Sequence, residues 1–188
     1  MSVSVPMKPA GRPVASLIAL TRGRTTAAYV LLGLGAVVKT WPIVLLPVYL
    51  VYRRTRRAIG GFVTVLVLVL LPFAIVATVG AYNTFRGQLD RHLQLETLGS
   101  SVLLLLGLPS HTGFDAGSWN VFGGGADHVG QLQSALQVGL IGLVAWVFAR
   151  SRRSREDLLV AVLATVAVFA FAGKVLSPQY LLWVAPFA

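Results

Sequence analysis

The feature that most constrains the fold is an apolar run from Phe62 to Ala81, which is long enough to cross a lipid bilayer. A cluster of four arginines stands just before it: Arg53, Arg54, Arg56 and Arg57. The 188-residue chain as a whole is 56% hydrophobic and only 12% charged, with a mean hydropathy of +0.77. This composition excludes an ordinary soluble enzyme and predicts a multi-pass membrane protein.

The positive charge is concentrated beside the apolar runs. The chain has a formal net charge of +10, and a second cluster contains Arg150, Arg152, Arg153 and Arg155. Short arginine-rich loops face the cytoplasm under the positive-inside rule, so both clusters are predicted to be cytoplasmic. Neither cluster has interleaved aromatic residues or a nucleic-acid-binding motif, so we expect no nucleic-acid partner. The chain has no cysteine, which excludes disulfides and thiolate chemistry.

The runs and clusters together predict an all-α fold, a polytopic transmembrane helical bundle with a short helical hairpin and a large external loop. Residues 1–24 are predicted to be an N-terminal cytoplasmic segment and 25–188 the transmembrane region. The predicted spans are 25–38, 41–52, 62–81, 129–149 and 158–173, with the start of another at 181 and the external loop at 82–128. Because the last apolar run reaches only Ala188, we expect the chain to be a fragment of a longer protein.

Lys39 divides the segment from Thr25 to Tyr52 into the two arms of the predicted hairpin. A lysine at the centre of a single span would cost about 2.5 to 3.5 kcal/mol, and a turn at Lys39, close to Pro42, avoids that cost. An ionisable group in apolar sequence is a candidate functional site, and Lys39 can bind a phosphate near the outer leaflet. The alternative is that the Lys39 side chain extends to the membrane interface, beside Trp41.

In the predicted external loop, Phe85, Leu89 and Leu93 recur at helical spacing. This spacing predicts an amphipathic helix at the membrane surface. Arg91 on such a helix can bind a phosphate through paired, charge-assisted hydrogen bonds.

Two further polar residues of this segment, His92 and Glu96, can orient a sugar hydroxyl or exchange a proton. The alternative is a solvated helix face held by ion pairs four residues apart. Those pairs would join Arg86 to Asp90 and His92 to Glu96.

The other polar features are less specific. Lys174 and the following turn can bind phosphate, but Pro178 there also suits the ordinary start of a helix. His111 and His128 lack the spacing of metal ligands, so no metal site is expected. The glycines at 123–125 lack the strand and the spacing of a phosphate-binding loop and are interpreted as loop.

Four short motifs follow one another in a defined order along the chain. They are Arg22-Gly-Arg24, Lys39-Thr-Trp-Pro42, Asp90-Arg91 with Leu93-Gln-Leu-Glu-Thr97, and Lys174-Val-Leu-Ser-Pro-Gln-Tyr180. Together they resemble glycosyltransferase family 87 over roughly residues 22–188. The resemblance implies the C-type integral-membrane glycosyltransferase fold. It also implies an activity like that of the family's actinobacterial mannosyltransferases, which use polyprenyl-phosphate mannose on the outer face of the cell membrane.

The family's Arg-Gly-Leu-Gln-x-Glu-Ser pattern maps onto Arg91, Leu93, Gln94, Glu96 and Thr97, with His92 in place of a small residue and Thr97 in place of serine. The resemblance implies an inverting transfer, in which an acceptor oxygen attacks the sugar carbon and a lipid phosphate leaves. Arg91 and Lys39 are the candidates to stabilise that phosphate. The candidate sugar or phosphate contacts are Gln94, Glu96, Gln179 and Tyr180.

The family's general-base aspartate lies in an external loop that matches no part of this chain, so the catalytic residue is unknown. We therefore expect the 188-residue chain to be inactive alone. No cofactor is implied, and the expected partners are a polyprenyl-phosphate sugar donor, a lipid or glycan acceptor, and membrane lipid. Two other classes of function stay open: a small transporter component, which would also have broken helices, and a noncatalytic protein that binds anionic lipid.

Overall fold

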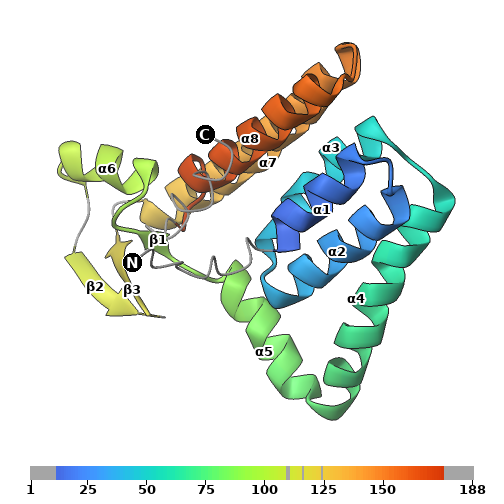
Figure 1. Ribbon diagram of the computed structural model, residues 1–188. Helices are drawn as coiled ribbons and strands as arrows, with labels where there is room; N and C mark the ends of the chain where they lie inside the picture. The colour runs from blue at the N-terminus through green and yellow to red at the C-terminus, as the bar shows by residue number, and fades with distance from the viewer. Residues whose placement is uncertain (1–11, 109–110, 116, 124, 176–188) are drawn as a thin grey trace, which may run out of the picture. The chain divides into compact units, whose positions relative to one another are not determined.

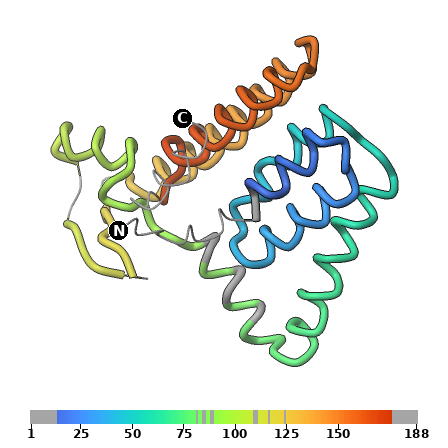
Figure 2. Tube along the Cα trace, viewed as in Figure 1, coloured from blue at the N-terminus to red at the C-terminus, as the bar shows by residue number. Residues whose placement is uncertain are grey.

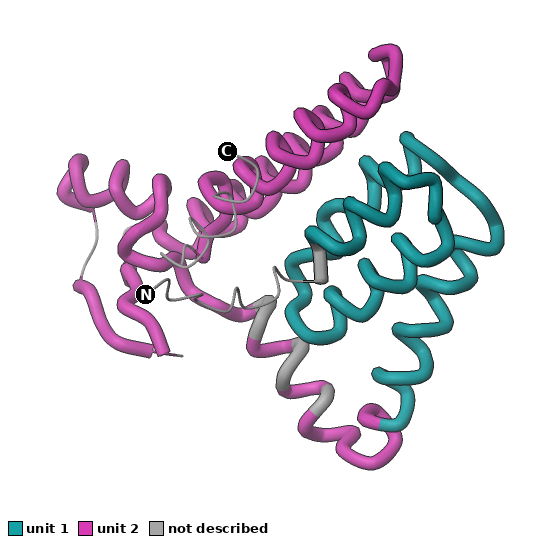
Figure 3. The backbone as a smooth tube through the Cα atoms, viewed as in Figure 1, with its two compact units in different colours: residues 1–72 teal, residues 73–188 magenta. Residues whose placement is uncertain are grey.

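The computed structural model describes residues 12–108, 111–115, 117–123 and 125–175. The chain is mostly helical and divides into two compact units, residues 1–72 and 73–188 (Figure 3). The predicted helix start at 181, together with Gln179 and Tyr180, lies outside the described residues.

The first unit is built from short helices and the start of one long helix (Figure 1). Its elements are α1 (Arg12–Thr21), α2 (Thr25–Val38), the 3-10 helix η1 (Trp41–Leu45), α3 (Leu46–Tyr52) and α4 (Arg56–Val76), which continues past Pro72 into the second unit. The chain turns at Lys39 and Thr40, where the sequence predicts the turn of the hairpin. Pro42 fits the first turn of η1, where its missing N–H leaves no hydrogen bond unmade.

Helix α1 is an element that the sequence did not predict, because its apolar stretch is short and lies within the expected N-terminal segment. A buried polar network fixes it to the hairpin. The Ser16 hydroxyl oxygen lies 2.8 Å from the Ala28 carbonyl oxygen and 3.1 Å from the Tyr49 hydroxyl oxygen. The Tyr29 ring meets the Tyr49 ring edge to face, with centroids 5.9 Å apart, and its hydroxyl donates to the Arg53 carbonyl at 3.1 Å. The network thereby joins α1, α2, α3 and the first arginine cluster.

A glycine contact brings α2 and α4 close together. A Cβ atom on Gly33 would lie 3.2 Å from the Phe62 carbonyl oxygen and 3.3 Å from Val65 Cβ. On the facing helix, a Cβ on Gly61 would lie 3.0 Å from a methyl group of Val30. Small residues at such contacts let helix backbones approach closely, as they do between membrane helices.

Helix α4 corrects the predicted span at 62–81. The helix begins earlier, at Arg56, and ends at Val76, and a new helix starts at Thr78. The break follows Pro72, and the last carbonyls of α4 are satisfied locally: the Ala77 N–H donates to Phe73 O at 2.9 Å and the Thr78 hydroxyl donates to Ala74 O at 2.7 Å. Hydropathy could not locate this break, because Ala77 is itself apolar.

Among the described residues, two helices are long and apolar enough to cross a bilayer by length and composition: α4 and α7 (Ala126–Arg150). Only 6% of the most apolar stretch of α4 and 22% of that of α7 are buried in the protein. Helices that expose so much apolar surface match a lipid environment better than water.

The second unit combines helices with a small sheet, so the predicted all-α class is wrong in this respect. Its elements are α5 (Thr78–Leu89), β1 (Leu93–Gln94), α6 (Leu98–Leu105), β2 (His111–Asp115), β3 (Ser118–Phe122), α7 and α8 (Arg155–Phe171). The strand order is β1-β3-β2, with both pairs antiparallel. The predicted external loop at 82–128 is therefore largely structured.

The core of this unit lies between one face of the sheet and the helices α6 and α7. Leu93 on β1 pairs with Val121 on β3, and the two side chains are buried together with Leu103 of α6 and Ala126 of α7. This packing fixes the register, because a shift by one residue would turn the apolar side chains to the opposite face.

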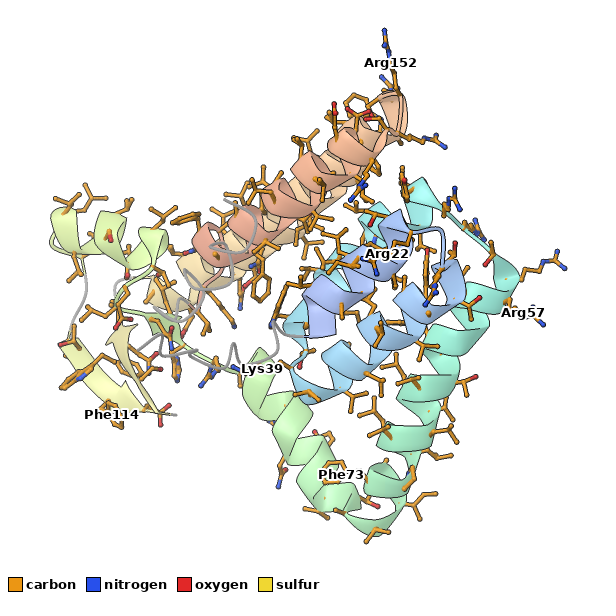
Figure 4. All side chains as sticks on the ribbon, viewed as in Figure 1. Arg22, Lys39, Arg57, Phe73, Phe114 and Arg152 are labelled. Carbon is orange, nitrogen blue, oxygen red and sulfur yellow. The ribbon has the colours of Figure 1, made fainter. Side chains whose placement is uncertain are left out.

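Helices α7 and α8 run side by side, as the orange and red segments of Figure 2 show. The turn between them carries the second arginine cluster, and Arg152 points away from the helices (Figure 4). Ser154 caps α8 in a capping box with Asp157. The Ser154 backbone N–H donates to the Asp157 carboxylate at 3.1 Å and holds the pKa of that carboxyl below its usual value.

Candidate functional site

The candidate site centres on the segment after α5, which is a strand and turn where the sequence predicts a continuing helix. Helix α5 ends at Leu89, with Asp90 as its C-cap. Leu93 lies in β1 and is buried, so its helical spacing from Phe85 and Leu89 does not reflect a shared helix face. The sheet overrides the local pattern, because pairing with Val121 buries Leu93 fully.

One of the two predicted ion pairs is present, and the other has a different partner. Arg86 Nε lies 3.1 Å from Asp90 Oδ2, and both side chains are exposed. His92 contacts Asp127 in place of Glu96, with its Nδ1 3.3 Å from Asp127 Oδ1. Asp127 stands in the first turn of α7, so it is anchored and is not a mobile loop residue.

The His92 ring also packs against Phe122, an aromatic residue of β3. Its ring centroid lies 4.8 Å from that of Phe122. His111 stacks on the same Phe122 ring at 5.0 Å, with the two rings 12° from parallel. These contacts give both histidines a packing role. In the part of the chain that the structure describes, no three His, Asp or Glu side chains group as metal ligands.

Gln94 joins two of the sequence motifs. Its backbone N–H donates to the Lys174 carbonyl at 3.1 Å, while the next residue, Leu95, donates to the Trp119 carbonyl at 2.9 Å. Strand β1 is thus held on one side by β3 and on the other by the start of the Lys174 motif. Lys174 also approaches through its side chain, since a Cβ on Gly130 would lie 3.8 Å from Lys174 Cδ and 3.8 Å from Leu93 Cβ.

The Gln94 side chain carries an unsatisfied acceptor. The residue is only 6% exposed, and its Oε1 is buried without a hydrogen-bond partner among the described residues. An unmade hydrogen bond of this kind costs about 1 to 3 kcal/mol, so native proteins seldom leave one without a function. A carbonyl-type oxygen can only accept, so a ligand that satisfies it must bring an O–H or N–H group.

Gln133 on α7 bonds to residues that adjoin these two motif segments. Its Nε2 donates to the Gly173 carbonyl at 2.7 Å, and its Oε1 accepts from the Gly99 N–H at 3.1 Å. One turn further on, Gln137 Nε2 donates to the Phe169 carbonyl at 2.9 Å. The sequence analysis did not select these residues. The available signal was two glutamines four residues apart on a predicted span, which places both on one helix face.

Thr97 shapes the turn between β1 and α6. Its hydroxyl donates to the Gln94 carbonyl at 2.9 Å and accepts from the Ser100 N–H at 3.4 Å. The Ser100 hydroxyl in turn lies 2.6 Å from the Leu95 carbonyl oxygen. Thr97 is the N-cap of α6, a position that serine and threonine hydroxyls both suit.

The predicted site residues are distributed as follows. Arg91 is partly buried and Glu96 is exposed, and both flank Gln94 on the same segment. Lys39 is exposed at the C-cap of α2, in the first unit (Figure 4). Gln179 and Tyr180 lie outside the described residues.

Comparison with known proteins gives one match. The model of glycosyltransferase family 87 matches residues 12–178. Searches of the curated proteins and of the solved structures found no significant match. The family match spans most of the chain, including the Asp90–Thr97 motif and the Lys174 motif as far as Pro178. The chain therefore belongs to glycosyltransferase family 87, a family of membrane glycosyltransferases.

Proposed function

We propose that this protein is part of a multi-pass hexosyltransferase of the cell membrane, with the C-type fold that its family implies. It transfers mannose from a polyprenyl-phosphate sugar to a lipid or glycan acceptor on the outer face. Family membership supports the transferase activity. The exposed apolar surfaces of α4 and α7 support the membrane location, and the arginine clusters next to these helices support the orientation.

The observation that carries the proposal is the junction at Gln94. It brings the Arg91 segment and the Lys174 segment into direct backbone contact, beside a buried oxygen that lacks a donor. A polyprenyl-phosphate sugar offers both complementary groups: an anionic phosphate for a guanidinium and sugar hydroxyls for an acceptor oxygen. We assign phosphate binding to Arg91 and a sugar hydroxyl to Gln94. Lys39, Glu96, Gln179 and Tyr180 are further proposed contacts to the sugar or the phosphate.

In the proposed reaction, the acceptor oxygen forms a bond to the anomeric carbon while the bond from that carbon to the phosphate oxygen breaks. The lipid phosphate leaves with the electron pair, and the proton of the acceptor hydroxyl passes to a general base. Arg91 stabilises the negative charge that builds up on the departing phosphate. The guanidinium is suited to this task, because its fork of N–H groups matches two phosphate oxygens.

Three of the six carboxylates of the chain have structural partners. Asp90 is paired with Arg86, Asp127 with His92, and Asp157 caps α8. We propose that the general base comes from the external loop of the family that matches no part of this chain, and that the chain by itself binds the donor without efficient transfer.

The test is photocrosslinking of a polyprenyl-phosphate mannose probe to the protein in nanodiscs, with Arg91→Ala compared with Arg86→Ala. The two arginines are five residues apart, and Arg86 is held in a surface ion pair. In membranes with the complete transferase activity, Arg91→Ala should slow sugar transfer about 30- to 1,000-fold, equivalent to about 2 to 4 kcal/mol. Arg91→Lys should recover little of it. Equal crosslinking of both alanine variants would remove Arg91 from the site.

A further inference from the structure

Helix α6 leaves most of its apolar side chains exposed. Its inward face buries Ser100 and Leu103. Its outward face exposes Leu98, Val102 and Leu105, the last of them 87% exposed. A helix in water normally turns its apolar stripe to the core and its polar residues to solvent. Here Ser100 lies inward beside Leu103, while Leu98, Val102, Leu104 and Leu105 are exposed.

Both ends of α6 are satisfied by the protein itself. At the N-terminus, the Gly99 N–H donates to Gln133 and the Ser100 N–H to the Thr97 hydroxyl. At the C-terminus, the Gly107 N–H donates to Leu104 O and the Leu108 N–H to Leu103 O, each at 3.1 Å, in a Schellman arrangement. Gly107 has the positive φ of 65° that this arrangement requires. A helix whose end groups are paired in this way does not depend on water to satisfy them.

The position of α6 beside α7 indicates its depth. Gln133, the α7 residue that binds Gly99, lies about 10 Å along the helix axis from Ala126. Helix α7 has 25 residues and is about 37 Å long, somewhat longer than the hydrocarbon core of about 30 Å. Its C-terminal end carries the cytoplasmic arginine cluster, so the contact with Gly99 lies near the outer boundary of the hydrocarbon.

Exposed apolar side chains lie on both helices near this contact. On α7, Leu132 and Leu136 flank Gln133 and are 70% and 55% exposed. Between Leu98 and Leu108, no residue is charged. With its 8 residues, α6 is about 12 Å long, too short to cross the membrane.

We infer that α6 lies in the outer leaflet as a monotopic helix, with its exposed leucines among the acyl chains. Thr97, the N-cap of α6, is also the last residue of the Arg91–Thr97 segment, so the depth of α6 sets the depth of that segment. The segment is thereby held at the level of lipid phosphate groups. This inference needs the membrane location of the chain but not its sugar specificity.

The test measures depth with spin labels, in proteoliposomes of phosphatidylcholine and phosphatidylglycerol. Single cysteines are introduced at Leu105, at Asp115 on the exposed hairpin, and at Val138 on the lipid face of α7; the chain has no native cysteine to interfere. Collisions of each label with oxygen, which partitions into lipid, are compared with collisions with a water-soluble nickel complex. A fourth label at Leu98 reports on the first turn of α6.

The Leu105 label should behave like the Val138 label, with frequent oxygen collisions and nickel collisions at least about tenfold below those at Asp115, since a polar complex is excluded from hydrocarbon. Nickel collisions at Leu105 equal to those at Asp115 would overturn the inference, because the helix would face water. Low collision rates with both reagents would also overturn it, because the leucines would then be covered by protein. No sugar transfer is measured, so the outcome is independent of the proposed reaction.

Discussion

Replacing Gln133 by leucine should weaken the second unit more than any change of an exposed glutamine on the same helix. The substitution removes a donor from Gly173 O and an acceptor from the Gly99 N–H, two bonds of 2.7 and 3.1 Å made by a residue that is 7% exposed. Each buried group left without a partner costs about 1 to 3 kcal/mol in a soluble protein. Polar contacts between membrane helices average about 0.6 kcal/mol by double-mutant cycles. For two bonds, these values bracket a loss of about 1 to 6 kcal/mol in the free energy of unfolding.

Two variants calibrate this prediction. Gln137→Leu removes the single bond to Phe169 O and should cost about half as much. Gln131→Leu changes an exposed side chain on the same helix and should be nearly neutral. The assay is thermal unfolding in detergent micelles, followed by circular dichroism and by retention on size-exclusion chromatography.

Changing Gly99, the partner of Gln133, tests the same contact independently. A Cβ on Gly99 would overlap Gln133 Oε1 and come within 2.8 Å of Val129 Cγ1, so Gly99→Ala should destabilise the same unit. If Gln133→Leu and Gln131→Leu unfold at the same temperature, the bonds of Gln133 to Gly99 and Gly173 do not stabilise the second unit. The proposed role of Gln133 in holding the candidate site is then refuted.

Three further predictions concern packing, pH and topology. Gly33→Ala should destabilise the first unit, because the new methyl group would meet the Phe62 carbonyl oxygen, whereas Gly60→Ala adds its methyl group to open space and should be neutral or stabilising in thermal unfolding. Because the pKa of Asp157 is lowered in the folded state, its contribution to the free energy of unfolding is fully present above the ordinary carboxyl pKa of 3.8 and is lost as the pH falls through the lowered value. The stability difference between wild type and Asp157→Ala should therefore shrink in unfolding scans below pH 3.8. A constant difference would contradict this. Single cysteines at Ser118 and Ser151 should differ in intact cells, with an impermeant thiol reagent labelling only Ser118, and labelling at Ser151 would reverse the orientation.

The sequence predicted the helices well where hydropathy alone determines them. The long apolar runs correspond to α4 and α7, and the lysine in an apolar segment marks the turn after α2. The sheet was not predictable, because β1 contains only two residues and pairs with residues about 27 positions away in the sequence. Local spacing instead placed Leu93 on a helix. Hydropathy also missed the break at Ala77, which depends on Pro72 and on the backbone bonds beyond it.

For the candidate site, the sequence proposes residues, but it does not give their geometry. The motif pattern proposes Arg91 and Gln94 as site residues, while the proximity of Gln94 to Lys174 depends on tertiary folding. Helical spacing of four residues correctly predicted the ion pair between Arg86 and Asp90. The same spacing failed for His92, whose partner Asp127 lies at the start of α7. Side-chain partners across such a sequence distance are set by packing and not by local periodicity.

The central claim is that the protein serves transfer of a hexose from a lipid-linked phosphate donor at the outer membrane surface. The most direct measurement follows radiolabelled mannose into the lipid and glycan fractions of membranes that contain the protein, with either polyprenyl-phosphate mannose or nucleotide-linked mannose as the donor. The account predicts incorporation from the polyprenyl donor alone and a loss of about 30-fold or more with Arg91→Ala, in contrast to Arg86→Ala. Equal incorporation from the nucleotide donor in the absence of polyprenyl phosphate, or full activity of Arg91→Ala, would contradict it.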